Sequence, residues 1–276
     1  MKQPVIFTDL DGTLLDHETY SFGPALPALK LIRELDIPLI VCSSKTRKEI
    51  EWYRDKLGNT HPFISENGGG IFIPSGYFDT LGQFLRSAET LEDGYVMIRL
   101  GAPYRELRSA LLELRNEGFG ITGFGDMTTA EVAAVTGLPE EQAAMSRERD
   151  FDEPFLFNGD DTVAVKLQEA IRLKGFNLTQ GRFFHILGGS DKGKAAAILA
   201  DLYRKNYGEI TTCALGDSPN DLPMLEYVDY PVIVKKSDGR HDPRIDIPRL
   251  IKAEGAGPIG WNLAIIGLLD DWRRDC

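Results

Sequence analysis

Near the N-terminus, short unbroken apolar runs alternate with segments whose apolar residues recur at helical spacing. A short run of this kind predicts a buried strand, and a longer periodic segment predicts a helix. The apolar runs cover residues 4–8, 37–42, 62–65 and 70–74, and the periodic segments cover 24–35 and 45–58. Ser44 and Gly58 are residue types that begin and end helices. The order strand, helix, strand, helix, strand is typical of a parallel sheet with crossover helices.

The C-terminal third resumes this pattern. Residues 190–208 predict a helix capped by Ser190 or Asp191 and ended by Gly208, and 210–221 predict a strand followed by a loop. A further short strand is predicted at 231–234. The two ends of the chain therefore predict one α/β unit built on a shared parallel sheet.

The middle of the chain predicts a separate unit, a small sheet with helices on one face. The predicted strands are 95–101, 153–159 and 182–187, and the predicted helices are 103–120, 161–175 with Asp161 as its cap, and two short helices within 127–149 separated at residues 137–139. We expect residues 1–83 and 188–276 to form the core and residues 84–187 to form the inserted unit.

Composition excludes several classes of protein. The 276 residues carry a formal net charge of -11, and this acidic balance argues against nucleic-acid binding, which needs a basic surface. No apolar run approaches the roughly 18 residues that span a bilayer, and the first residues lack a signal-peptide pattern. Cys42, Cys213 and Cys276 fit neither a disulfide framework nor a zinc site, so we expect a reducing cytoplasmic location, with Cys42 and Cys213 packed in the core.

Polar residues gather where the predicted strands end or the next helices begin. In chain order they are Asp9 and Asp11, Ser43, Lys192, and then Asp217, Asn220 and Asp221. Because the carboxyl ends of parallel strands meet at one edge of a sheet, we expect these side chains to converge. Crowded carboxylates need a cation, and oxygen ligands without His or Cys suit Mg²⁺. Lys192 and Ser43 suit phosphate, so the pattern predicts a phosphoryl-transfer site.

Simpler interpretations exist for several of these residues. Asp9, Asp217 and Asp221 are types that also stabilise turns. Ser43 and Ser44 compete for one phosphate contact, and we favour Ser43 because it directly follows the strand. Other polar residues also have purely structural interpretations. Lys194 fits a surface position, His185 a packed hinge residue, and Arg149 a solvated charged face. Asn67 fits a turn residue that could also approach a substrate.

The order DLDGT, a serine after the second strand, a late lysine and GDSPND resembles the haloacid dehalogenase superfamily of phosphatases. The resemblance covers about residues 1–80 and 188–276 and implies a Rossmann-like core with an inserted α/β cap of the type called C2B. The resemblance also implies that Asp9 is the nucleophile and that Asp11 is the general acid and base. It implies that Ser43 and Lys192 bind the phosphoryl oxygens. It further implies that Mg²⁺ is held by Asp9, the backbone carbonyl of Asp11 and Asp217, and that Asn220 and Asp221 orient these metal ligands.

Five further stretches resemble the mannosyl-3-phosphoglycerate phosphatases: CSSKTRKEI, SENGGGIFIP, RDFDEPF, GRFFHILGGSDKGKA and GPIGW. This resemblance implies Mg²⁺-dependent hydrolysis of mannosyl- or glucosyl-3-phosphoglycerate through an aspartyl-phosphate. The family often has Tyr and Ser where this chain has Phe151 and Asp152. The substrate-binding residues that we expect are Ser43, Lys45, Thr46, Lys192 and Asn220 near the phosphate, Arg149 and Arg182 for the carboxylate, and Glu153 for the sugar hydroxyls.

Other functions remain open at this point. The same chemistry could act on hexose or sucrose phosphates, or move a phosphoryl group as phosphomutases of related fold do. A non-catalytic module that keeps the fold is disfavoured by the intact pair Asp9 and Asp11. We also predict hinges near residues 80–88 and 186–190, with Gly188 and Gly189 as the permissive pair.

Overall fold

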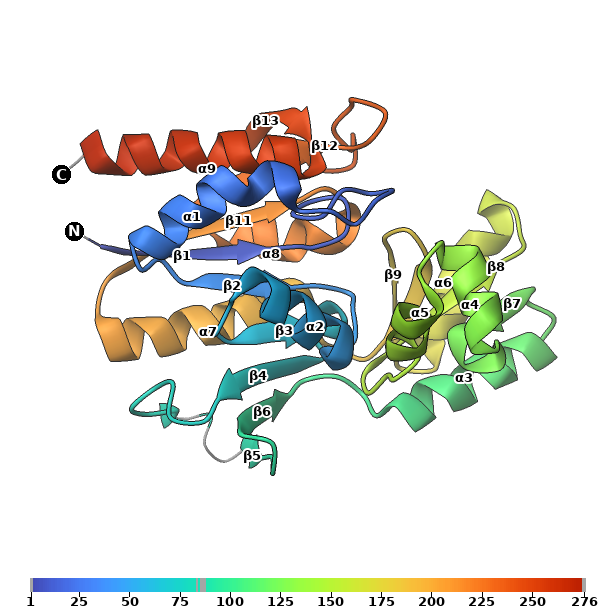
Figure 1. Ribbon diagram of the computed structural model, residues 1–276. Helices are drawn as coiled ribbons and strands as arrows, with labels where there is room; N and C mark the ends of the chain where they lie inside the picture. The colour runs from blue at the N-terminus through green and yellow to red at the C-terminus, as the bar shows by residue number, and fades with distance from the viewer. Residues whose placement is uncertain (1, 83, 85–87, 275–276) are drawn as a thin grey trace.

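The computed structural model describes residues 2–82, 84 and 88–274 and contains two sheets (Figure 1). The larger has nine strands, whose order from edge to edge is β13 (Ile251–Ala256), β12 (Tyr230–Lys235), β11 (Ile210–Gly216), β1 (Gln3–Thr8), β2 (Leu39–Cys42), β3 (Phe63–Ser65), β4 (Gly70–Pro74), β6 (Tyr95–Arg99) and β5 (Ala88–Thr90). Strands β13 to β3 are parallel, and β4, β6 and β5 extend the sheet in antiparallel pairs.

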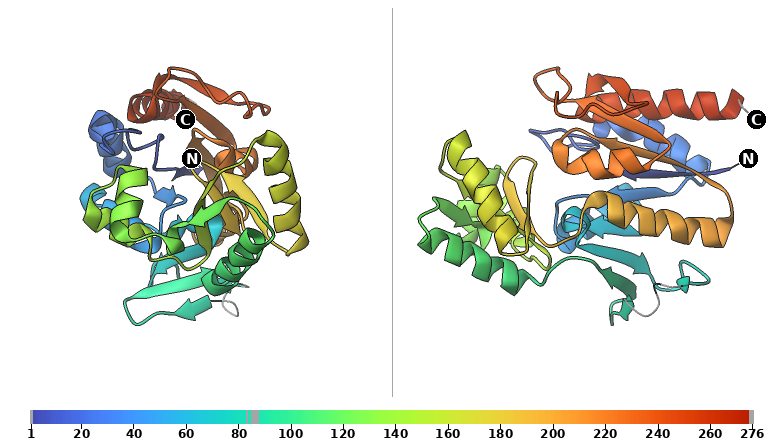
Figure 2. Two further views of the ribbon diagram at one scale, coloured as in Figure 1. Left: turned by 90° about the vertical axis from the view of Figure 1, so that its right-hand side faces the viewer. Right: turned by 180° about the vertical axis from the view of Figure 1, so that it is seen from behind.

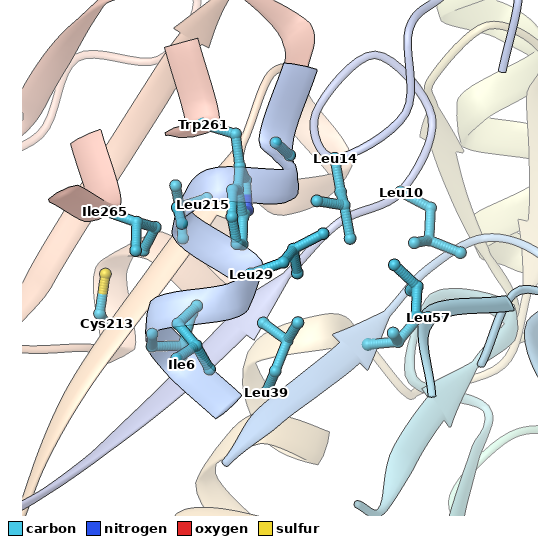
Figure 3. Packing of buried hydrophobic residues seen from close by; sticks show 14 of the residues in the cluster. Ile6, Leu10, Leu14, Leu29, Leu39, Leu57, Cys213, Leu215, Trp261 and Ile265 are labelled. Atoms are coloured by element: carbon cyan, nitrogen blue, oxygen red, sulfur yellow. The ribbon is translucent and has the colours of Figure 1, made fainter. Parts of the chain in front are cut away.

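Helices cover both faces of the large sheet because its parallel strands are apolar on both sides. Along β1, Ile6 faces one cluster of buried residues, and Val5 and Phe7 face the other. The first cluster is packed by α1 (Leu26–Glu34), α2 (Arg47–Leu57) and α9 (Gly257–Arg274); the second is packed by α7 (Lys192–Tyr207) and α8 (Leu222–Tyr227). Figure 3 shows Trp261 of α9 beside Leu215 and Leu29 in the first cluster.

The smaller sheet belongs to the inserted cap. Its strands, all antiparallel, are β7 (Ile121–Gly123), β8 (Asp152–Phe157), β10 (Phe184–Leu187) and β9 (Asn177–Gln180). One face packs against α3 (Tyr104–Asn116) and α6 (Asp161–Leu173) through Leu111, Leu167 and Phe155. Two short helices, α4 (Thr129–Thr136) and α5 (Glu140–Ser146), complete the cap beside α2. A small sheet with helices on one face is present as expected, but the predicted strand at 95–101 is not part of it, and β7 and β9 were not predicted.

The position of the cap determines where a ligand can bind. The cap lies beyond the carboxyl ends of the parallel strands, and both chain termini lie at the opposite end of the core (Figures 1 and 2). The carboxyl end of an open parallel sheet is where α/β proteins bind ligands. Within residues 2–82, 84 and 88–274, no helix is both long and apolar enough to span a bilayer.

Three predicted details differ from the structure. Strands β5 and β6 pair with the core sheet, so the cap begins after Arg99 and not at residue 84; residues 83 and 85–87, at the predicted boundary and hinge, lie outside the described part. Helix α2 is capped by Thr46, not Ser44, because Thr46 and Glu49 form a reciprocal capping box. Helix α6 is capped by Asp160, not Asp161.

Candidate active site

The loops that follow β1, β2 and β11 meet the start of α7 beneath the cap and enclose a cavity of about 400 Å³. From the core, Asp9, Asp11, Lys45, Asp217 and Asn220 line this cavity. From the cap, Arg149, Pro154, Arg182, Phe183 and His185 line it. Residues from both ends of the chain and from the inserted unit therefore share one cavity.

Lys192 links two of the loops at the floor of the site. Its Nζ lies 2.6 Å from Asp9 Oδ1 and 2.6 Å from Asp221 Oδ1, and all three side chains are buried. Burial opposes the charge on Lys192, but the carboxylates of Asp221 and Asp9 raise its pKa. The lysine therefore stays protonated and holds one oxygen of Asp9.

Asp217 completes a cluster of carboxylates. One oxygen each from Asp9, Asp217 and Asp221 lie within 4.8 Å of one another. Burial and the neighbouring Asp221 raise the pKa of Asp217 to about 7. Burial raises the pKa of Asp9 as well, and the nearby carboxylates add to the shift while Lys192 opposes it. Three acids with one lysine leave excess negative charge in a buried place, which a divalent cation would neutralise.

The donor set fits a hard cation. Asp221 is already engaged, because its Oδ1 accepts from Lys192 and its Oδ2 accepts from the backbone N–H groups of Asp217 and Ser218 at 3.0 and 3.1 Å. A cation in this cluster would therefore be ligated directly by Asp9 and Asp217, with Asp221 holding their loop. Gly12 permits this approach, since a Cβ there would lie 3.0 Å from Asp217 Oδ2. The cluster consists of carboxylate oxygens, the donor type that suits Mg²⁺, and the assignment of individual ligands stays a prediction.

Asp11 lies in the cavity wall and is partly exposed. Its Oδ2 is 3.1 Å from Lys45 Nζ, which also lies 3.2 Å from Glu49 Oε1. Burial opposes the charge on Lys45, yet Asp11 and Glu49 raise its pKa. The other oxygen, Asp11 Oδ1, has no hydrogen-bond partner among the described residues. Asp11 is thus fixed through Oδ2, while Oδ1 is buried and unpaired among the described residues.

The loop after β2 places its polar residues differently from the prediction. Ser43 is fully buried and its Oγ accepts from Lys45 N at 3.3 Å, whereas the neighbouring Ser44 lines the cavity. Thr46 is also buried: its Oγ1 caps α2 and donates to the backbone oxygen of Met145 at 2.9 Å. Thr46 therefore joins the core to the cap and is not placed to contact substrate.

Arg149 and Arg182 both line the cavity, in different environments. The Arg149 side chain is 5% exposed, donates to Ser44 O at 2.9 Å and lies 3.4 Å from Asp152 Oδ1. This burial removes the interpretation of Arg149 as part of a solvated face. Arg182 is exposed and donates to Tyr20 Oη at 2.9 Å. Both line the cavity from the cap side, where an anion could meet them, and Arg149 is the more deeply buried.

Glu153 is not placed as predicted. Side chains on a strand alternate between its two faces, so Pro154 faces the cavity and Glu153 faces the helices of the cap. Its Oε1 accepts from Arg108 and from Gly125 N, and its Oε2 accepts from Tyr104 Oη. Because the carboxylate is fully buried and saturated by the cap, it has no oxygen for a sugar hydroxyl.

Several residues that line the cavity were not predicted from the sequence. Lys236 and Ser237 line the cavity and directly follow β12. Their place after a parallel strand is the same signal that pointed to Asp9, and it could have pointed to them. His185 lines the cavity and is not merely a packed hinge residue. Tyr20, in the loop after β1, donates to Thr136 O in the cap at 3.3 Å, and no local sequence pattern predicted that contact.

Comparisons with known proteins identify the family of this chain. The sequence model of the family described as haloacid dehalogenase-like hydrolase matches residues 6–79 and 161–241. The chain is 48% identical over 268 residues to a glucosyl-3-phosphoglycerate/mannosyl-3-phosphoglycerate phosphatase of Methanococcoides burtonii, covering 96% of this chain and 97% of that protein. It is 39% identical over 240 residues to a mannosyl-3-phosphoglycerate phosphatase of Pyrococcus furiosus, covering 86% and 93%.

Solved structures share the whole fold at low identity. A Thermoplasma acidophilum protein, 0175, matches with a TM-score of 0.70 at 16% identity, over 98% of this chain and 99% of that one. The sucrose-phosphatase of Synechocystis sp. PCC6803, solved with sucrose and phosphate, matches with a TM-score of 0.62 at 14% identity, over 98% of each chain.

The chain belongs to the haloacid dehalogenase-like hydrolases, as its motifs predicted. Within that family it is a phosphoric monoester hydrolase that resembles the glucosyl-3-phosphoglycerate/mannosyl-3-phosphoglycerate phosphatases. The predicted α/β core with an inserted cap is confirmed.

Proposed function

We propose that this protein is a Mg²⁺-dependent phosphatase that converts glucosyl- or mannosyl-3-phosphoglycerate to the glycosylglycerate and phosphate, in the cytoplasm. The main observation behind this proposal is a buried cluster at the floor of a capped cavity, formed by Asp9, Lys192, Asp217 and Asp221. The names of the relatives at 48% and 43% identity support this substrate class.

The chain's own residues suggest a route with a covalent intermediate. Lys192 holds Oδ1 of Asp9, so Oδ2 is the oxygen that attacks phosphorus. The new O–P bond forms as the bond from phosphorus to the glycerate oxygen breaks, and Asp11 gives a proton to that oxygen. Asp11 then takes a proton from the water that cleaves the aspartyl-phosphate. Mg²⁺ at Asp9, the Asp11 backbone oxygen and Asp217 would offset the charge of the phosphoryl oxygens.

The cap would hold the rest of the substrate. Arg149 reaches the cavity from a buried position, and its guanidinium can meet the glycerate carboxylate. Phe124, Leu138 and Phe183 supply apolar surface for a sugar ring. With the cap closed, bulk water is kept from the aspartyl-phosphate until the leaving group departs.

The test is phosphate release from a substrate panel, with Mg²⁺ or with EDTA. The panel contains glucosyl- and mannosyl-3-phosphoglycerate, glucose 6-phosphate, sucrose 6-phosphate and an aryl phosphate. We expect the glycosyl-phosphoglycerates to have the highest kcat/KM, and EDTA to abolish turnover. A preference for hexose or sucrose phosphate would refute the substrate assignment.

The mechanism has its own test. Asp9→Asn removes the nucleophile, so kcat should fall by at least about 1000-fold. The fold should persist because Lys192 keeps its bond to Asp221, and circular dichroism with thermal unfolding checks this. Turnover retained by a folded Asp9→Asn variant would exclude the covalent route.

A further inference from the structure

A chain of hydrogen bonds starts at the cap side of the cavity and crosses to the core. His185 lines the cavity, and its Nδ1 lies 2.8 Å from Asp152 Oδ1. The other oxygen of Asp152, Oδ2, accepts from Asn67 Nδ2 at 2.6 Å. His185 and Asp152 belong to cap strands, whereas Asn67 follows β3 in the core. The bond between Asn67 and Asp152 therefore exists only while the cap is seated.

Within the core, the chain continues to the candidate metal ligand. Asn220 Nδ2 donates to Asn67 Oδ1 at 3.1 Å. Ser218 Oγ lies 2.9 Å from both Asn220 Oδ1 and Asp217 Oδ1. A hydroxyl has one hydrogen, so Ser218 shares it between two acceptors. The position of the Asn220 amide therefore affects how firmly Ser218 holds Asp217.

The cap end of this chain is buried and charged. Asp152 is fully buried, and Asn67 and His185 are 2% and 4% exposed. Burial alone would raise the pKa of Asp152, but His185, Arg149 and Asn67 together lower it. An ionised, desolvated carboxylate makes strong hydrogen bonds to its donors. The geometry of Asn67 is thus set by a charged group that the cap provides.

The backbone around Asn67 is held in an unusual conformation. Glu66 and Asn67 have φ of 49° and 54°, a region that residues other than glycine rarely adopt. Such conformations persist where the surroundings enforce them. Here Glu66 accepts from the backbone N–H groups of Asp150 and Phe151 in the cap. On the other side, a Cβ at Gly68 would clash with the backbone oxygen of Asp191, next to Lys192.

We propose that Asn67 is a positioning residue through which the seated cap orients Asp217, so that a substrate held against His185 also organises the metal site. The inference rests on the proposed function, since that function assigns Asp217 to Mg²⁺. Asn67 does not line the cavity, so it would contact neither the metal nor the substrate directly. It acts through Asn220 and Ser218 on one side and through Asp152 on the other.

The test exchanges the two partners across the interface. Asn67→Asp places a second carboxylate against Asp152 and breaks the chain. In the double variant Asn67→Asp with Asp152→Asn, the new amide at position 152 can donate to the new carboxylate at position 67 and still accept from His185. Asn67→Gly keeps the left-handed backbone without the side chain. Asn177→Asp is the matched control, because Asn177 donates to Gly188 O in the linker and lies outside the chain.

Mg²⁺ affinity is measured by titration calorimetry with the metal alone, and kcat with the glycosyl-phosphoglycerate. We expect Asn67→Asp and Asn67→Gly to weaken Mg²⁺ binding and lower kcat by roughly 10- to 100-fold, the usual cost of losing a group that supports a metal ligand. The double variant should recover most of this loss, and Asn177→Asp should keep its Mg²⁺ affinity within about 3-fold of wild type.

Three outcomes would overturn the inference: unchanged Mg²⁺ affinity in folded Asn67→Asp and Asn67→Gly, no recovery in the double variant, or an equal loss in Asn177→Asp. A rise in KM for the large substrate without any change in Mg²⁺ affinity also overturns it, because the chain would then only seat the cap. The calorimetric comparison needs no substrate, so it still decides the matter if the proposed substrate is wrong.

Discussion

Glu153 and Asp11 are both carboxylates near the cavity, but only Asp11 has an oxygen without a hydrogen-bond partner among the described residues. Every oxygen of Glu153 is bonded inside the cap, to Arg108, Tyr104 and a backbone N–H. Asp11 is held through Oδ2 by Lys45, and its Oδ1 has no partner among the described residues. At the scale of a residue, chemical type shows what a side chain could do, and its free lone pairs show what it can still do.

Glu153→Gln is therefore expected to affect stability and not substrate choice. The variant keeps the size of the side chain but loses the charge that pairs with Arg108, so the free energy of unfolding should fall by about 1–3 kcal/mol. The ratio of kcat/KM between the glycosyl-phosphoglycerate and an aryl phosphate should stay within about 3-fold of wild type. Arg149→Lys is the comparison, and this ratio should fall there by roughly 10-fold or more. A selective loss in Glu153→Gln at normal stability would contradict this.

Asp217 predicts a dependence of metal binding on pH. Its raised pKa of about 7 means that the metal-free protein holds a proton on this carboxyl at pH 6 and has released it at pH 8. Mg²⁺ requires the ionised form, so its affinity should rise roughly 10-fold between these pH values. The same shift stabilises the metal-free fold at low pH, and that contribution is lost as pH rises through about 4 to 7.

Differential scanning calorimetry with saturating Mg²⁺ or with EDTA checks the sign of this effect. The increase in Tm caused by Mg²⁺ should be larger at pH 8 than at pH 6. Asp217→Asn serves as the control, because position 217 can no longer titrate, so the difference should shrink to what the raised pKa of Asp9 contributes. An increase at pH 6 that equals or exceeds the one at pH 8 would show that Asp217 does not carry the metal.

At the scale of elements, two linkers join the core and the cap: residues 100–103 between β6 and α3, and residues 188–191 between β10 and α7. Gly188 and Gly189 differ in how close they come to the other linker. An added Cβ at Gly188 would lie 2.6 Å from Ala102 N in the other linker, whereas a Cβ at Gly189 meets nothing within 4 Å. Gly188→Ala should therefore push the linkers apart, lower the free energy of unfolding by about 1–3 kcal/mol and slow turnover. Gly189→Ala, the matched control, should change neither.

Stopped-flow and steady-state kinetics separate these linker effects. If cap movement limits turnover, Gly188→Ala should lower kcat for the large substrate more than for an aryl phosphate. Equal behaviour of the two alanine variants would mean that the linkers do not need to lie so close. The predicted hinge at residues 186–190 would then have no support from this pair.

The elements that the sequence predicted well are those with a clean hydrophobic pattern. The strand at β1 and the helices at α2 and α7 match because their apolar residues and end signals are local. Helix α9 was missed, although it is long, because it follows β13 directly at Gly257 and carries no polar cap. Strands β5 and β6 were assigned to the wrong unit, since pairing partners depend on contacts far apart in sequence.

The candidate site divides in the same way. The structure brings Asp9, Asp11 and Asp217 to one cavity, with Lys192 against Asp9, because the ends of parallel strands and the starts of helices share one edge of the sheet. Their roles stay predictions. Glu153 and Thr46 were wrongly predicted to contact substrate, and His185 was not predicted to line the cavity. The direction of these side chains depends on strand register and on contacts between core and cap. Sequence patterns place backbone positions, and tertiary contacts decide which atoms remain free.

At the scale of the whole molecule, charge is distributed unevenly. The formal net charge is -11, and a glycosyl-phosphoglycerate is itself an anion. The cavity is nearly balanced, because its lining has five carboxylates against four cations: Asp9, Asp11, Asp16, Glu49 and Asp217 against Lys45, Arg149, Arg182 and Lys236. Several of these cations are already paired, Lys45 with Asp11 and Lys236 with Asp242. The residues that line the cavity therefore attract an anionic substrate only at contact distance. At longer range, the net negative charge of the protein repels that substrate.

Screening that surface should help the enzyme. At about 0.1 M salt, charges more than about 10 Å apart interact weakly, so repulsion from the surface fades while the contacts in the cavity persist. We expect kcat/KM to rise by roughly 2- to 5-fold between 10 mM and 150 mM NaCl, at saturating Mg²⁺, mainly through a lower KM. Initial rates at each salt concentration measure this, with Mg²⁺ saturation confirmed separately because salt also weakens metal binding. A fall in kcat/KM with salt would mean that Arg149, Arg182 and the bound metal together outweigh the net charge of the whole chain.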